Sequence, residues 1–539
     1  MDVYEKVMAM AKRRGFIYPS YEIYGGEAGF YDYGPLGSLM KNNIENIWRE
    51  FYIIGERFFE ISTPSITPYR VLKASGHVDE FIDEIATCKK CNQSFKVEEL
   101  EDNKCPICNG EVEMKKLSPM FETFIGAVKK DKAFLRPETA QGIFVDFPLL
   151  YEFFRKKIPF GVIQIGKGYR NEVSPRQGII RLREFSMAEA EIFFKPDKKK
   201  HEKFKDVENE VVRLFPVGKE EMQISIKEAV DKGIVGNEAL AYYIILTKKF
   251  LINVGIDEKK LRFRQHEKNE LAHYANECWD AEIYSNRFGW IECVGIADRA
   301  AYDLKSHMNY TNIDMRVFEK FDEPKKEKKM IIKAKMDKLG KVFRKDAKKI
   351  KDVIEKMSIE KKKKIKLTID GKKYEIGEEF YEIEEKEETI SGRKYVPHVI
   401  EPSYGIDRIF YFILEHNYKE IEKEGERYVI LSLPPRISPI KAGVFPLVNR
   451  DGLPEIAKEI EEDLRKNGIL AIYDDRGSIG RRYARMDEIG TPYCITVDYT
   501  TLKDDTATIR FRDTAEQTRI NRKEIPKWIK ERINCFAKI

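Results

Sequence analysis

Side chains that alternate along one predicted strand combine cations, an aromatic ring and carboxylates. The segment from Arg181 to Phe194 predicts a strand, and the side chains of a strand alternate between its two faces. One face would carry, in order, Arg181, Arg183, Phe185, Met187, Glu189 and Glu191. Because unpaired buried charges are costly, such a face is a poor core surface. It suits a pocket for a phosphate, a flat ring and an ammonium group, although a solvated face with salt bridges has the same composition.

Four cysteines form the most specific metal-binding pattern in the sequence. Cys88 and Cys91 form one C-x2-C pair, and Cys105 and Cys108 form a second pair after thirteen intervening residues. Two such knuckles supply four thiolates, the ligand set of a tetrahedral structural zinc site, and they leave no open position for catalysis. A redox pair is the alternative, but two pairs are present and neither follows a βα pattern.

Three further charged residues occupy positions that are unusual for their type. Glu138 lies where a charged strand end enters an apolar helix, where it could also be only a carboxylate near a helix N-terminus. Glu292 is a lone carboxylate on a short apolar strand, where burial without a partner would be costly. Arg408 falls on the first turn of an otherwise apolar helix, directly after a strand and the tight turn that Gly405 allows.

Three histidines are expected to have no catalytic or metal-binding role. His77 alone is more often structural than functional. His266 and His273 could share one helix face, but no third ligand lies nearby in the sequence. We therefore interpret both as structural or substrate-adjacent residues.

The elements that must position these residues follow from periodicity and from chain breakers. Residues 1–15 predict an amphipathic helix that ends at Gly15, and residues 38–55 predict a longer helix that feeds a strand interrupted by Pro64 and Pro68. A strand from 161 to 170 and a loop from 171 to 178 precede the strand at 181–194. Residues 195–261 predict a mostly helical inserted subdomain.

From about residue 427 the pattern changes to short apolar strands that alternate with helices. The segments YVILSLPP, ILAIYDD and TPYCITVD predict strands, and two amphipathic helices lie between them. This alternation predicts an α/β domain with a mixed sheet. The start of its second helix carries an arginine cluster, for which a surface charge patch is the simplest interpretation: Arg476, Arg481, Arg482 and Arg485.

Composition and charge limit the class of protein. The chain has 539 residues, of which 42% are hydrophobic, so two to four domains are expected. Residues 325–366 contain nineteen Lys or Arg against six Asp or Glu, a local charge of +13, so the remainder of this +6 chain carries −7. The basic segment is interpreted either as a solvated pair of charged helices or as a contact for a nucleic acid backbone.

The sequence lacks the signals of secretion and of membrane insertion. Its first residues contain no apolar signal core, and no run approaches the roughly 20 apolar residues of a membrane span. Eight cysteines in a chain of this length do not suggest a disulfide framework. We therefore expect a soluble cytoplasmic protein without membrane partners.

Several of these segments resemble one enzyme family. Arg170-Asn171-Glu172, a loop, and Arg181-x-x-x-Phe185 resemble motif 2 of the class II aminoacyl-tRNA synthetases, and the segment RNEVSPRQGIIRLREFSMAEAEIF resembles its glycyl-tRNA synthetase version. RPETAQG, FGWIECVGIADRAAYDL and EPSYGIDR resemble further segments of that family. The resemblance covers roughly residues 1–194, 262–320 and 395–539. Asp407 stands where some glycyl enzymes have Gly, although Asp is common at this position across the class.

The resemblance implies an activity and its ligands. Such an enzyme activates glycine with ATP to glycyl-adenylate, releases pyrophosphate, and transfers glycine to the 3′ end of tRNA(Gly). The expected catalytic residues are Arg170, Glu292 and Arg408, with Mg²⁺ beside Glu292. Residues expected to bind ATP are Arg170, Asn171, Glu172, Arg181, Leu182, Phe185, Glu292, Cys293 and Arg408. Residues expected to bind glycine are Glu138, Arg170, Glu189, Glu401 and Ser403, and the arginine cluster at 476–485 would contact RNA.

The resemblance also implies an architecture. We expect an α+β catalytic domain on an antiparallel sheet, the class II synthetase fold, with inserted zinc-knuckle and helical or basic subdomains, and a C-terminal α/β anticodon-binding domain. Catalytic segments are expected at 1–87, 116–194, 262–321 and 395–425, the zinc knuckles at 88–115, insertions at 195–261 and 322–394, and the last domain at 426–539. The helix at 38–55 resembles motif 1, which forms the homodimer interface in this class, although it could also pack within its own subunit.

Two other functions fit parts of the same pattern. One is a nucleic-acid-binding accessory protein with this fold but without catalysis. The retained site residues argue against it: Arg170, Glu172, Arg181, Phe185, Glu292 and Arg408. The other is an enzyme that activates a different small amino acid or serves another carrier. Three acidic residues in the expected pocket favour glycine, and the C-terminal domain favours tRNA.

Overall fold

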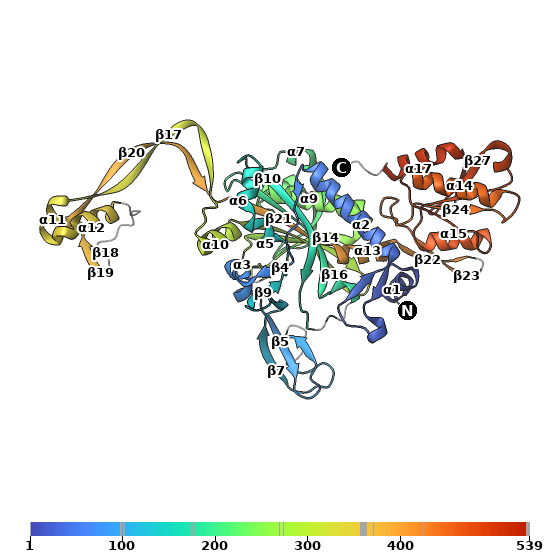
Figure 1. The fold of residues 1–539 in the computed structure, drawn as a ribbon, viewed down its shortest axis with the longest axis horizontal. Helices are drawn as coiled ribbons and strands as arrows, with labels where there is room; N and C mark the ends of the chain where they lie inside the picture. The colour runs from blue at the N-terminus through green and yellow to red at the C-terminus, as the bar shows by residue number, and fades with distance from the viewer. Residues whose placement is uncertain are drawn as a thin grey trace. The chain divides into compact units, whose positions relative to one another are not determined.

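A long, mostly antiparallel sheet organises the larger part of the protein (Figure 1). The structure is a computed structural model that describes residues 2–97, 100, 103–173, 175, 178–268, 270–272, 274–355, 364–369, 371–423 and 425–534. Among these residues, nine strands form the main sheet in the order β13-β12-β14-β15-β16-β21-β11-β10-β3. Contacts divide the chain into two units, residues 1–315 with 397–539 and residues 316–396.

The centre of this sheet brings together segments that are distant in the sequence. Strand β10 (Phe160–Tyr169) pairs with β11 (Glu184–Phe194), β11 with β21 (His398–Gly405), and β21 with β16 (Gly289–Ala300). All three pairs are antiparallel. The register places Glu189 opposite Ser403, and Ala297 opposite Glu401. The expected antiparallel sheet is therefore confirmed.

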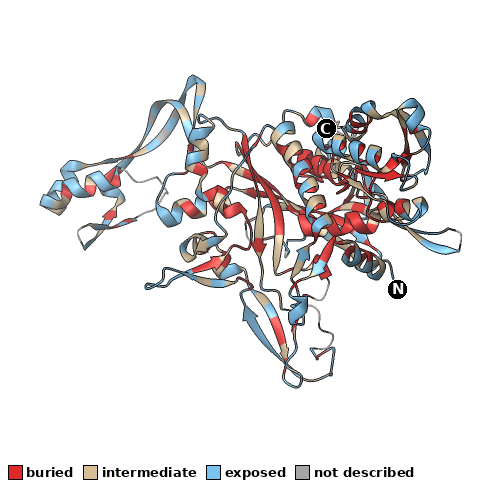
Figure 2. Cartoon of the chain, turned by 45° about the vertical axis from the view of Figure 1, so that its right-hand side comes forward, coloured by how far each residue is buried: buried red, intermediate tan, exposed pale blue. Residues whose placement is uncertain are grey.

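Apolar helices pack on the sheet and form the largest core (Figure 2). Helix α2 (Pro35–Arg49) continues into a π-helical turn at Glu50–Gly55, which together match the predicted helix at 38–55. Helix α13 (Ile406–Asn417) follows β21 through Gly405, as the sequence predicted. Helix α1 (Val3–Arg14) ends at Gly15, whose positive φ of 76° closes the C-terminus by accepting the left-handed conformation.

Residues 195–261 contain predicted helices, at Phe204–Val207, Ile226–Asp231 and Glu238–Asn253, but they do not form a separate subdomain. Strands β12 (Val211–Phe215) and β14 (Leu261–Gln265) pair in parallel, and β13 (Met222–Ser225) pairs with β12, so this segment extends the main sheet. Helix α9 (Glu238–Asn253) is buried along much of its length in the central core. Its apolar residues therefore belong to the core of the main sheet, where the helical pattern had suggested a separate body.

The remaining elements of this part of the protein are mostly short. Strands are β1 (Ile17–Pro19), β2 (Tyr31–Tyr33), β3 (Phe59–Glu60), β4 (Ile66–Pro68), β8 (Glu122–Ile125), β9 (Asp131–Leu135) and β15 (Glu277–Ser285). Helices are α3 (Tyr69–Ala74), α4 (His77–Glu80), α5 (Ala140–Val145), α6 (Phe147–Phe153), α7 (Phe204–Val207), α8 (Ile226–Asp231) and α10 (Tyr302–Thr311). The four-cysteine segment forms its own sheet from β5 (Asp83–Cys88), β6 (Ser94–Lys96) and β7 (Val112–Leu117).

The C-terminal part is an α/β domain, as predicted, but its strands differ in detail. Among the described residues its mixed sheet has the order β25-β24-β26-β27-β28, with β24 (Ala442–Pro446), β25 (Ala471–Tyr473), β26 (Tyr493–Val497), β27 (Thr506–Phe511) and β28 (Gln517–Asn521). Its helices are α14 (Leu453–Lys466), α15 (Ile479–Glu488), α16 (Thr501–Asp504) and α17 (Ile525–Asn534). The YVILSLPP segment is a strand, β23 (Glu426–Leu431), which pairs with β22 (Tyr418–Lys423) outside this sheet.

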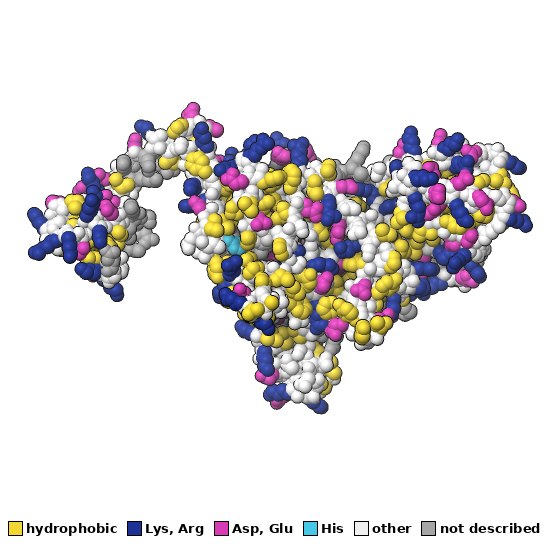
Figure 3. Space-filling view, viewed as in Figure 1, with side chains coloured by type: hydrophobic (Ala, Val, Ile, Leu, Met, Phe, Trp, Pro, Cys, Tyr) yellow, Lys and Arg dark blue, Asp and Glu magenta, His cyan; other side chains and the backbone are white. Residues whose placement is uncertain are grey.

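Residues 316–396 form the second unit, and neither interpretation of this segment anticipated its main element. Long strands β17 (Val317–Ala334) and β20 (Tyr381–Tyr395) pair antiparallel, where a pair of charged helices had been considered. Helices α11 (Met336–Phe343) and α12 (Ala347–Ile354) and strands β18 (Lys364–Ile369) and β19 (Lys372–Gly377) surround a small core of Leu339, Ile350 and Ile376. Lys and Arg side chains are prominent on its surface (Figure 3). Residues 356–363, part of the basic run, lie outside the described residues.

None of the helices in the described part of the chain combines the length and the apolar character that a bilayer crossing requires.

Candidate active site

Two adjoining chambers open on the face of the main sheet. The first, which we call the aromatic chamber, is lined by Arg170, Glu172, Ile179, Ile180, Arg181, Leu182, Phe185, Ser186, Met187, Glu292, Cys293, Ser403, Gly405, Asp407 and Arg408. The second, the acidic chamber, is lined by Glu138, Arg170, Met187, Glu189, His266, Glu270, Ala272, Tyr274, Ala275, Cys278, Asp280, Glu292, Gly295, Ala297, Glu401 and Ser403. Arg170, Met187, Glu292 and Ser403 line both chambers, so the two spaces meet at these side chains.

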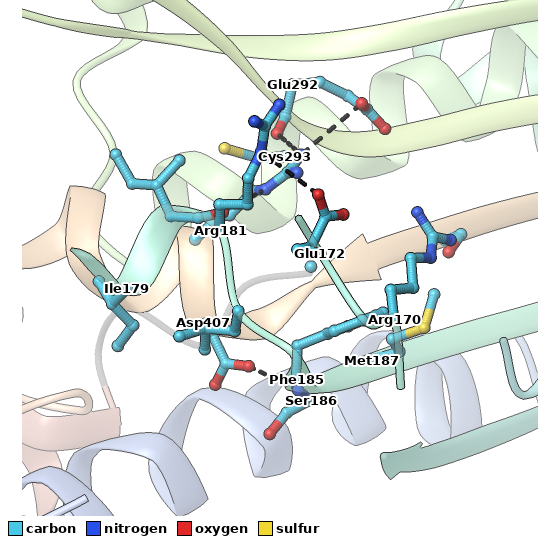
Figure 4. Close-up of a pocket in the computed structure, with 15 residues that line it drawn as sticks. Arg170, Glu172, Ile179, Arg181, Phe185, Ser186, Met187, Glu292, Cys293 and Asp407 are labelled. Carbon is cyan, nitrogen blue, oxygen red and sulfur yellow. Dashed lines mark hydrogen bonds and ion pairs between the residues drawn. The ribbon is translucent and has the colours of Figure 1, made fainter. Parts of the chain in front are cut away.

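In the aromatic chamber, arginine side chains and the partly buried Phe185 line the same space (Figure 4). The Arg170 guanidinium lies 5.4 Å from the centroid of the Phe185 ring. Arg408 is held by hydrogen bonds that it donates to the carbonyl oxygens of Ile180, at 3.1 Å, and Glu292, at 2.6 Å. Arg181 lies 3.8 Å from the Glu172 carboxylate. An aromatic ring in a space lined by several guanidinium groups suits a planar heterocycle, and the arginines suit its phosphates.

Asp407 holds the floor of the aromatic chamber in place. Its carboxylate accepts a hydrogen bond from the Ser186 backbone N–H at 2.5 Å and another from the Tyr33 hydroxyl. The side chain is buried on the first turn of α13. It therefore ties β11 to α13, and a Gly at this position could not make these bonds.

The structure differs from the sequence-based expectations at several residues of this chamber. Strand β11 begins at Glu184, so Arg181 and Arg183 do not share its face; a turn of 3-10 helix at Gly178–Ile180 precedes them. Arg183 donates to Glu27 and to the Ala28 carbonyl oxygen. Glu292 is not buried: its side chain is 52% exposed and lies 3.6 Å from Arg408. Asn171 is exposed and does not line the chamber.

The acidic chamber is built around carboxylates with defined partners. Glu189 accepts from the Thr139 backbone N–H at 2.7 Å and from the Thr139 hydroxyl, and its other oxygen accepts from Ser403 at 2.7 Å. Glu138 accepts from Gln141 at 2.9 Å and lies 3.4 Å from His77. The hydrogen bonds that fix these two carboxylates therefore come from neutral donors. The carboxylate oxygens remain able to accept from a bound ammonium group.

Arg299 is the central cation of this chamber, and the sequence analysis did not single it out. Its side chain is fully buried and donates to Glu401 at 2.6 Å and to both oxygens of Asp303 at 2.8 Å. It also stacks on Tyr274, with 3.6 Å between guanidinium and ring centroid. An arginine within the apolar run of β16, four residues before Asp303, was the signal that could have revealed it.

Burial and neighbouring charges shift the pKa values of the carboxyl groups in opposite directions. Although burial opposes ionisation of Glu138, His77 and Arg299 hold its pKa below the usual value. Burial raises the pKa of Glu401 to about 8, against the opposing effect of Arg299. Burial and the nearby Glu401 raise the pKa of Glu191 well above its usual value.

His266 lies in the wall of the acidic chamber and contacts Asp280 at 2.6 Å. Cys278 lies close enough to both for the three to form a possible ligand group. However, the same Asp280 oxygen also faces Arg264 at 3.4 Å. We therefore retain the interpretation of His266 as a structural or substrate-adjacent residue; His273 lies outside the described residues.

The four cysteines converge as their spacing predicted. Sγ of Cys88 lies 3.5 Å from Sγ of Cys108, and Sγ of Cys91 lies 3.6 Å from Sγ of Cys105. All four sulfur atoms lie within 4.8 Å of one another. Bonds of about 2.3 Å to a tetrahedral Zn²⁺ place sulfur atoms roughly 3.8 Å apart, so the donor set and spacing fit zinc.

The arginine cluster of the C-terminal domain has a mixed character. Arg482 is buried and donates to the carbonyl oxygens of Pro446, Asp475 and Gly477, and Arg485 pairs with Asp474. These two arginines therefore stabilise the start of α15. Arg476 and Arg481 are exposed and remain the members available to a ligand.

Comparisons with known proteins place these features in a family. A family model described as the tRNA synthetase class II core domain (G, H, P, S and T) matches residues 126–417, and one described as the anticodon binding domain matches residues 441–532. A glycine–tRNA ligase of Methanocaldococcus jannaschii is 52% identical over 576 residues, which cover 99% of each chain. The chain belongs to the glycine–tRNA ligase family.

Other members of the glycine–tRNA ligase family match over similar lengths. The one from Pyrococcus horikoshii is 47% identical over 569 residues, again 99% of each chain. A solved structure of Giardia lamblia prolyl-tRNA synthetase in complex with prolyl-adenylate has a TM-score of 0.57 at 14% identity, and the match covers 99% of this chain and 79% of that one. This structural likeness supports the class II fold expected from the sequence.

Proposed function

We propose that the protein is a glycine–tRNA ligase that forms glycyl-adenylate from glycine and ATP in its two chambers and then transfers glycine to the 3′ end of tRNA(Gly). The observation that carries this proposal is the junction of the chambers at Arg170. In adenylate formation the amino acid carboxylate attacks the α-phosphate, so these two groups must meet. A planar guanidinium at the junction can donate to oxygens of both.

ATP is proposed to occupy the aromatic chamber. Its adenine ring would lie between Phe185 and Arg408, and Glu172 would accept from the exocyclic amino group. Arg408 and Arg181 supply positive charge near the phosphates. Leu182 and Cys293 form the apolar part of the wall. Glu292 is exposed to the chamber and would hold Mg²⁺, which supplies charge neutralisation on the phosphates when bound.

Glycine is proposed to occupy the acidic chamber, with its ammonium group near Glu138, Glu189 and Glu401. Ser403 positions Glu189, and Arg299 positions Glu401. Glycine has no side chain, so selection must come from the exclusion of a Cβ by the surrounding wall. Steric overlap with a packed wall discriminates more strongly than the ~1–3 kcal/mol available from one missing methylene.

The chemistry requires orientation more than acid–base catalysis. The glycine carboxylate is already ionised at neutral pH and needs no general base. Arg170 aligns carboxylate and α-phosphate and neutralises charge that develops during the in-line displacement. The pyrophosphate then leaves toward Arg181 and Arg408.

The zinc site is proposed to be structural. Cys88, Cys91, Cys105 and Cys108 would hold Zn²⁺ and stabilise the small sheet of β5, β6 and β7, which has few apolar contacts of its own. The ion lies in a segment that does not line either chamber. Its four protein ligands leave no position for a substrate.

We further propose that the protein acts as a homodimer in the cytoplasm. Strand β3 is the last strand of the main sheet on its side, and its Phe59 is 52% exposed and packs against Phe153, which is 60% exposed. Leu149 on the same short helix is 72% exposed. An exposed apolar group at a sheet edge favours association with a second copy. Sedimentation of the purified protein would test this.

ATP–pyrophosphate exchange tests the central proposal. Purified protein would be assayed without tRNA in the presence of glycine, alanine, serine or proline. Exchange with glycine alone is expected. A folded protein that binds tRNA but supports no exchange would contradict the assignment and favour a non-catalytic accessory role, whereas exchange with alanine or serine would redefine the substrate.

A further inference from the structure

Arg299 projects from an irregular point in strand β16. The β16–β21 register places Asp298 opposite Ile400 and Ala300 opposite Val399, so Arg299 is the additional residue of a β-bulge. Ala300 has a φ of +47°, a left-handed conformation that is unfavourable for a residue with a Cβ. Bulges re-aim side chains, and strained backbone persists only where its surroundings hold it. The direction of Arg299 therefore depends on what holds this bulge.

Asp298 holds the bulge from the opposite face of the sheet. Its Oδ1 accepts from the Ala300 backbone N–H at 3.0 Å, which fixes the strained residue directly. Because side chains alternate along a strand, Asp298 points away from the acidic chamber. On the opposite face of the sheet its side chain is buried, with 4% exposed. The proposed glycine-binding carboxylates therefore do not contact it.

The other oxygen of Asp298 is bound by residues from 195–261. Lys199 donates to Oδ2, and Asn237 donates to the same oxygen at 3.2 Å. The Lys199 side chain is 13% exposed, so this ion pair is largely shielded from solvent. A shielded pair is worth more than a surface pair, and removal of one partner leaves a buried charge uncompensated.

The same residue also anchors the cover of the chamber. The Asp298 carbonyl oxygen accepts from the Asn276 backbone N–H at 2.8 Å. Two residues earlier, Tyr274 stacks on Arg299 at 3.6 Å. Asp298 is therefore connected to Arg299 both through the bulge and through the segment that covers its guanidinium.

We infer that the Lys199–Asp298 ion pair positions the amino acid site. It stabilises the β-bulge at Arg299 and Ala300, and this bulge directs the Arg299 side chain toward Glu401. Lys199 and Asp298 are positioning residues, since neither reaches the acidic chamber. The inference rests on the proposed assignment of that chamber to glycine. It gives the segment 195–261 a specific role in substrate selection, beyond its contribution to the sheet.

The test compares Lys199→Met with Lys200→Met. Lys200 is the neighbouring residue, is 76% exposed and pairs only loosely with Glu238 at 3.6 Å, so its variant is a matched control. ATP–pyrophosphate exchange would be measured with glycine and ATP varied separately. We expect Lys199→Met to raise the KM for glycine by about tenfold, while its KM for ATP stays within about twofold of the wild-type value. Lys200→Met should match wild type in both values. Lys199→Arg should restore most of the loss seen in Lys199→Met.

Several outcomes separate this inference from its foundation. If wild-type protein supports no glycine-dependent exchange, both the proposed function and the inference fail. If wild type is active and Lys199→Met has an unchanged KM for glycine, only the inference fails. Equal changes in both KM values, or a loss that Lys199→Arg does not restore, would indicate general destabilisation and would also overturn it. Thermal melting of each variant with saturating ATP identifies a variant that does not fold. If Lys199→Met does not fold, the milder Lys199→Gln, which keeps a donor but removes the charge, decides: a raised KM for glycine alone supports the inference, and unchanged values overturn it.

Discussion

Ser403 donates a hydrogen bond to Glu189 across the β11–β21 pair, at 2.7 Å between residues that are direct register partners. The other Glu189 oxygen is bound by Thr139, so the carboxylate is fixed from two sides before any ligand arrives. This arrangement costs little reorganisation when an ammonium group binds. It also explains why the strands that carry the two residues must be neighbours although they are far apart in the sequence.

Arg170→Ala is expected to reduce glycine-dependent exchange by roughly a hundredfold or more. The guanidinium is proposed to bind the reacting carboxylate and phosphate, and loss of about 3 kcal/mol of transition-state stabilisation corresponds to that factor. Lys167→Ala is a matched control, since Lys167 pairs with Glu184 on the same strand pair and lines neither chamber. Near wild-type exchange in Arg170→Ala would refute the assignment.

Glycine binding is expected to strengthen as pH rises toward and through about 8. Burial raises the pKa of Glu401 to about 8, so below that pH the group is largely neutral and attracts an ammonium group weakly. Above it, the carboxylate is ionised. The shift of melting temperature caused by glycine should grow between about pH 6.5 and 8.5, and Glu401→Gln should remove that growth. A wild-type shift that falls over this range would contradict the prediction.

The same group makes an opposite contribution to the stability of the ligand-free protein. Its pKa is higher in the folded chain than in the unfolded chain, so the folded state retains a proton that the unfolded state has lost. Its contribution is therefore fully present below about pH 4.5 and is lost as pH rises toward 8. Measured without glycine, the melting temperature of wild type relative to that of Glu401→Gln should therefore fall as the pH rises from about 4.5 toward 8.

Cys108→Ser is expected to lower the zinc content of the purified protein from one ion per chain toward zero. Three remaining ligands bind a structural ion less tightly, and the small sheet of β5, β6 and β7 has little core to replace it. Metal analysis and limited proteolysis at 83–117 would measure the effect. Lys90→Ala, an exposed residue within the first knuckle, should leave the zinc content unchanged; equal content in both variants would refute the zinc assignment.

Lysines of the second unit are expected to differ in their effect on tRNA binding according to whether they are paired. On β17, Lys328 and Lys333 form ion pairs with Glu385 and Glu384 of β20. On α11, Lys338 and Lys341 are exposed, and no ion pair to either is found among the described residues. The double variant Lys338→Ala/Lys341→Ala should weaken tRNA binding and lower its salt slope by about 1 per lost phosphate contact.

The matched control for that prediction is Lys328→Ala/Lys333→Ala. It removes the same number of charges, but these charges are already compensated by glutamates. A salt slope that is unchanged in the α11 variant, or reduced equally in both, would mean that this unit does not contact the tRNA backbone through unpaired lysines.

Much of the catalytic architecture could be predicted because its signals are local. The strand, turn and helix around Gly405 and the two cysteine knuckles have short, specific patterns, and the structure contains them where expected. Strands β12 and β13 were missed because they are only five and four residues long, too short for their alternation to stand out from the surrounding helical pattern. The burial expected of Glu292 was wrong, since an apolar flanking sequence cannot reveal that a strand borders an open chamber.

Features that depend on long-range pairing could not be predicted from the sequence alone. Runs of Lys and Glu favour helices by propensity, yet β17 and β20 pair as strands in which lysines lie opposite glutamates. The role of Arg299 likewise required knowledge that β16 lies beside β21, since its partner Glu401 is about a hundred residues away in the sequence.

The position of β21 has a consequence for the synthesis of the protein. This strand lies between β16 and β11, yet it leaves the ribosome only after the 97 residues that separate it from β16, residues 301–397. The chain is synthesised at about 5–20 residues per second, so the edges of β16 and β11 remain unpaired for several seconds before β21 is available. Folding of the catalytic core is therefore completed late, and the nascent chain depends during that interval on helices, chaperones or its own early hairpins to keep those edges from other chains.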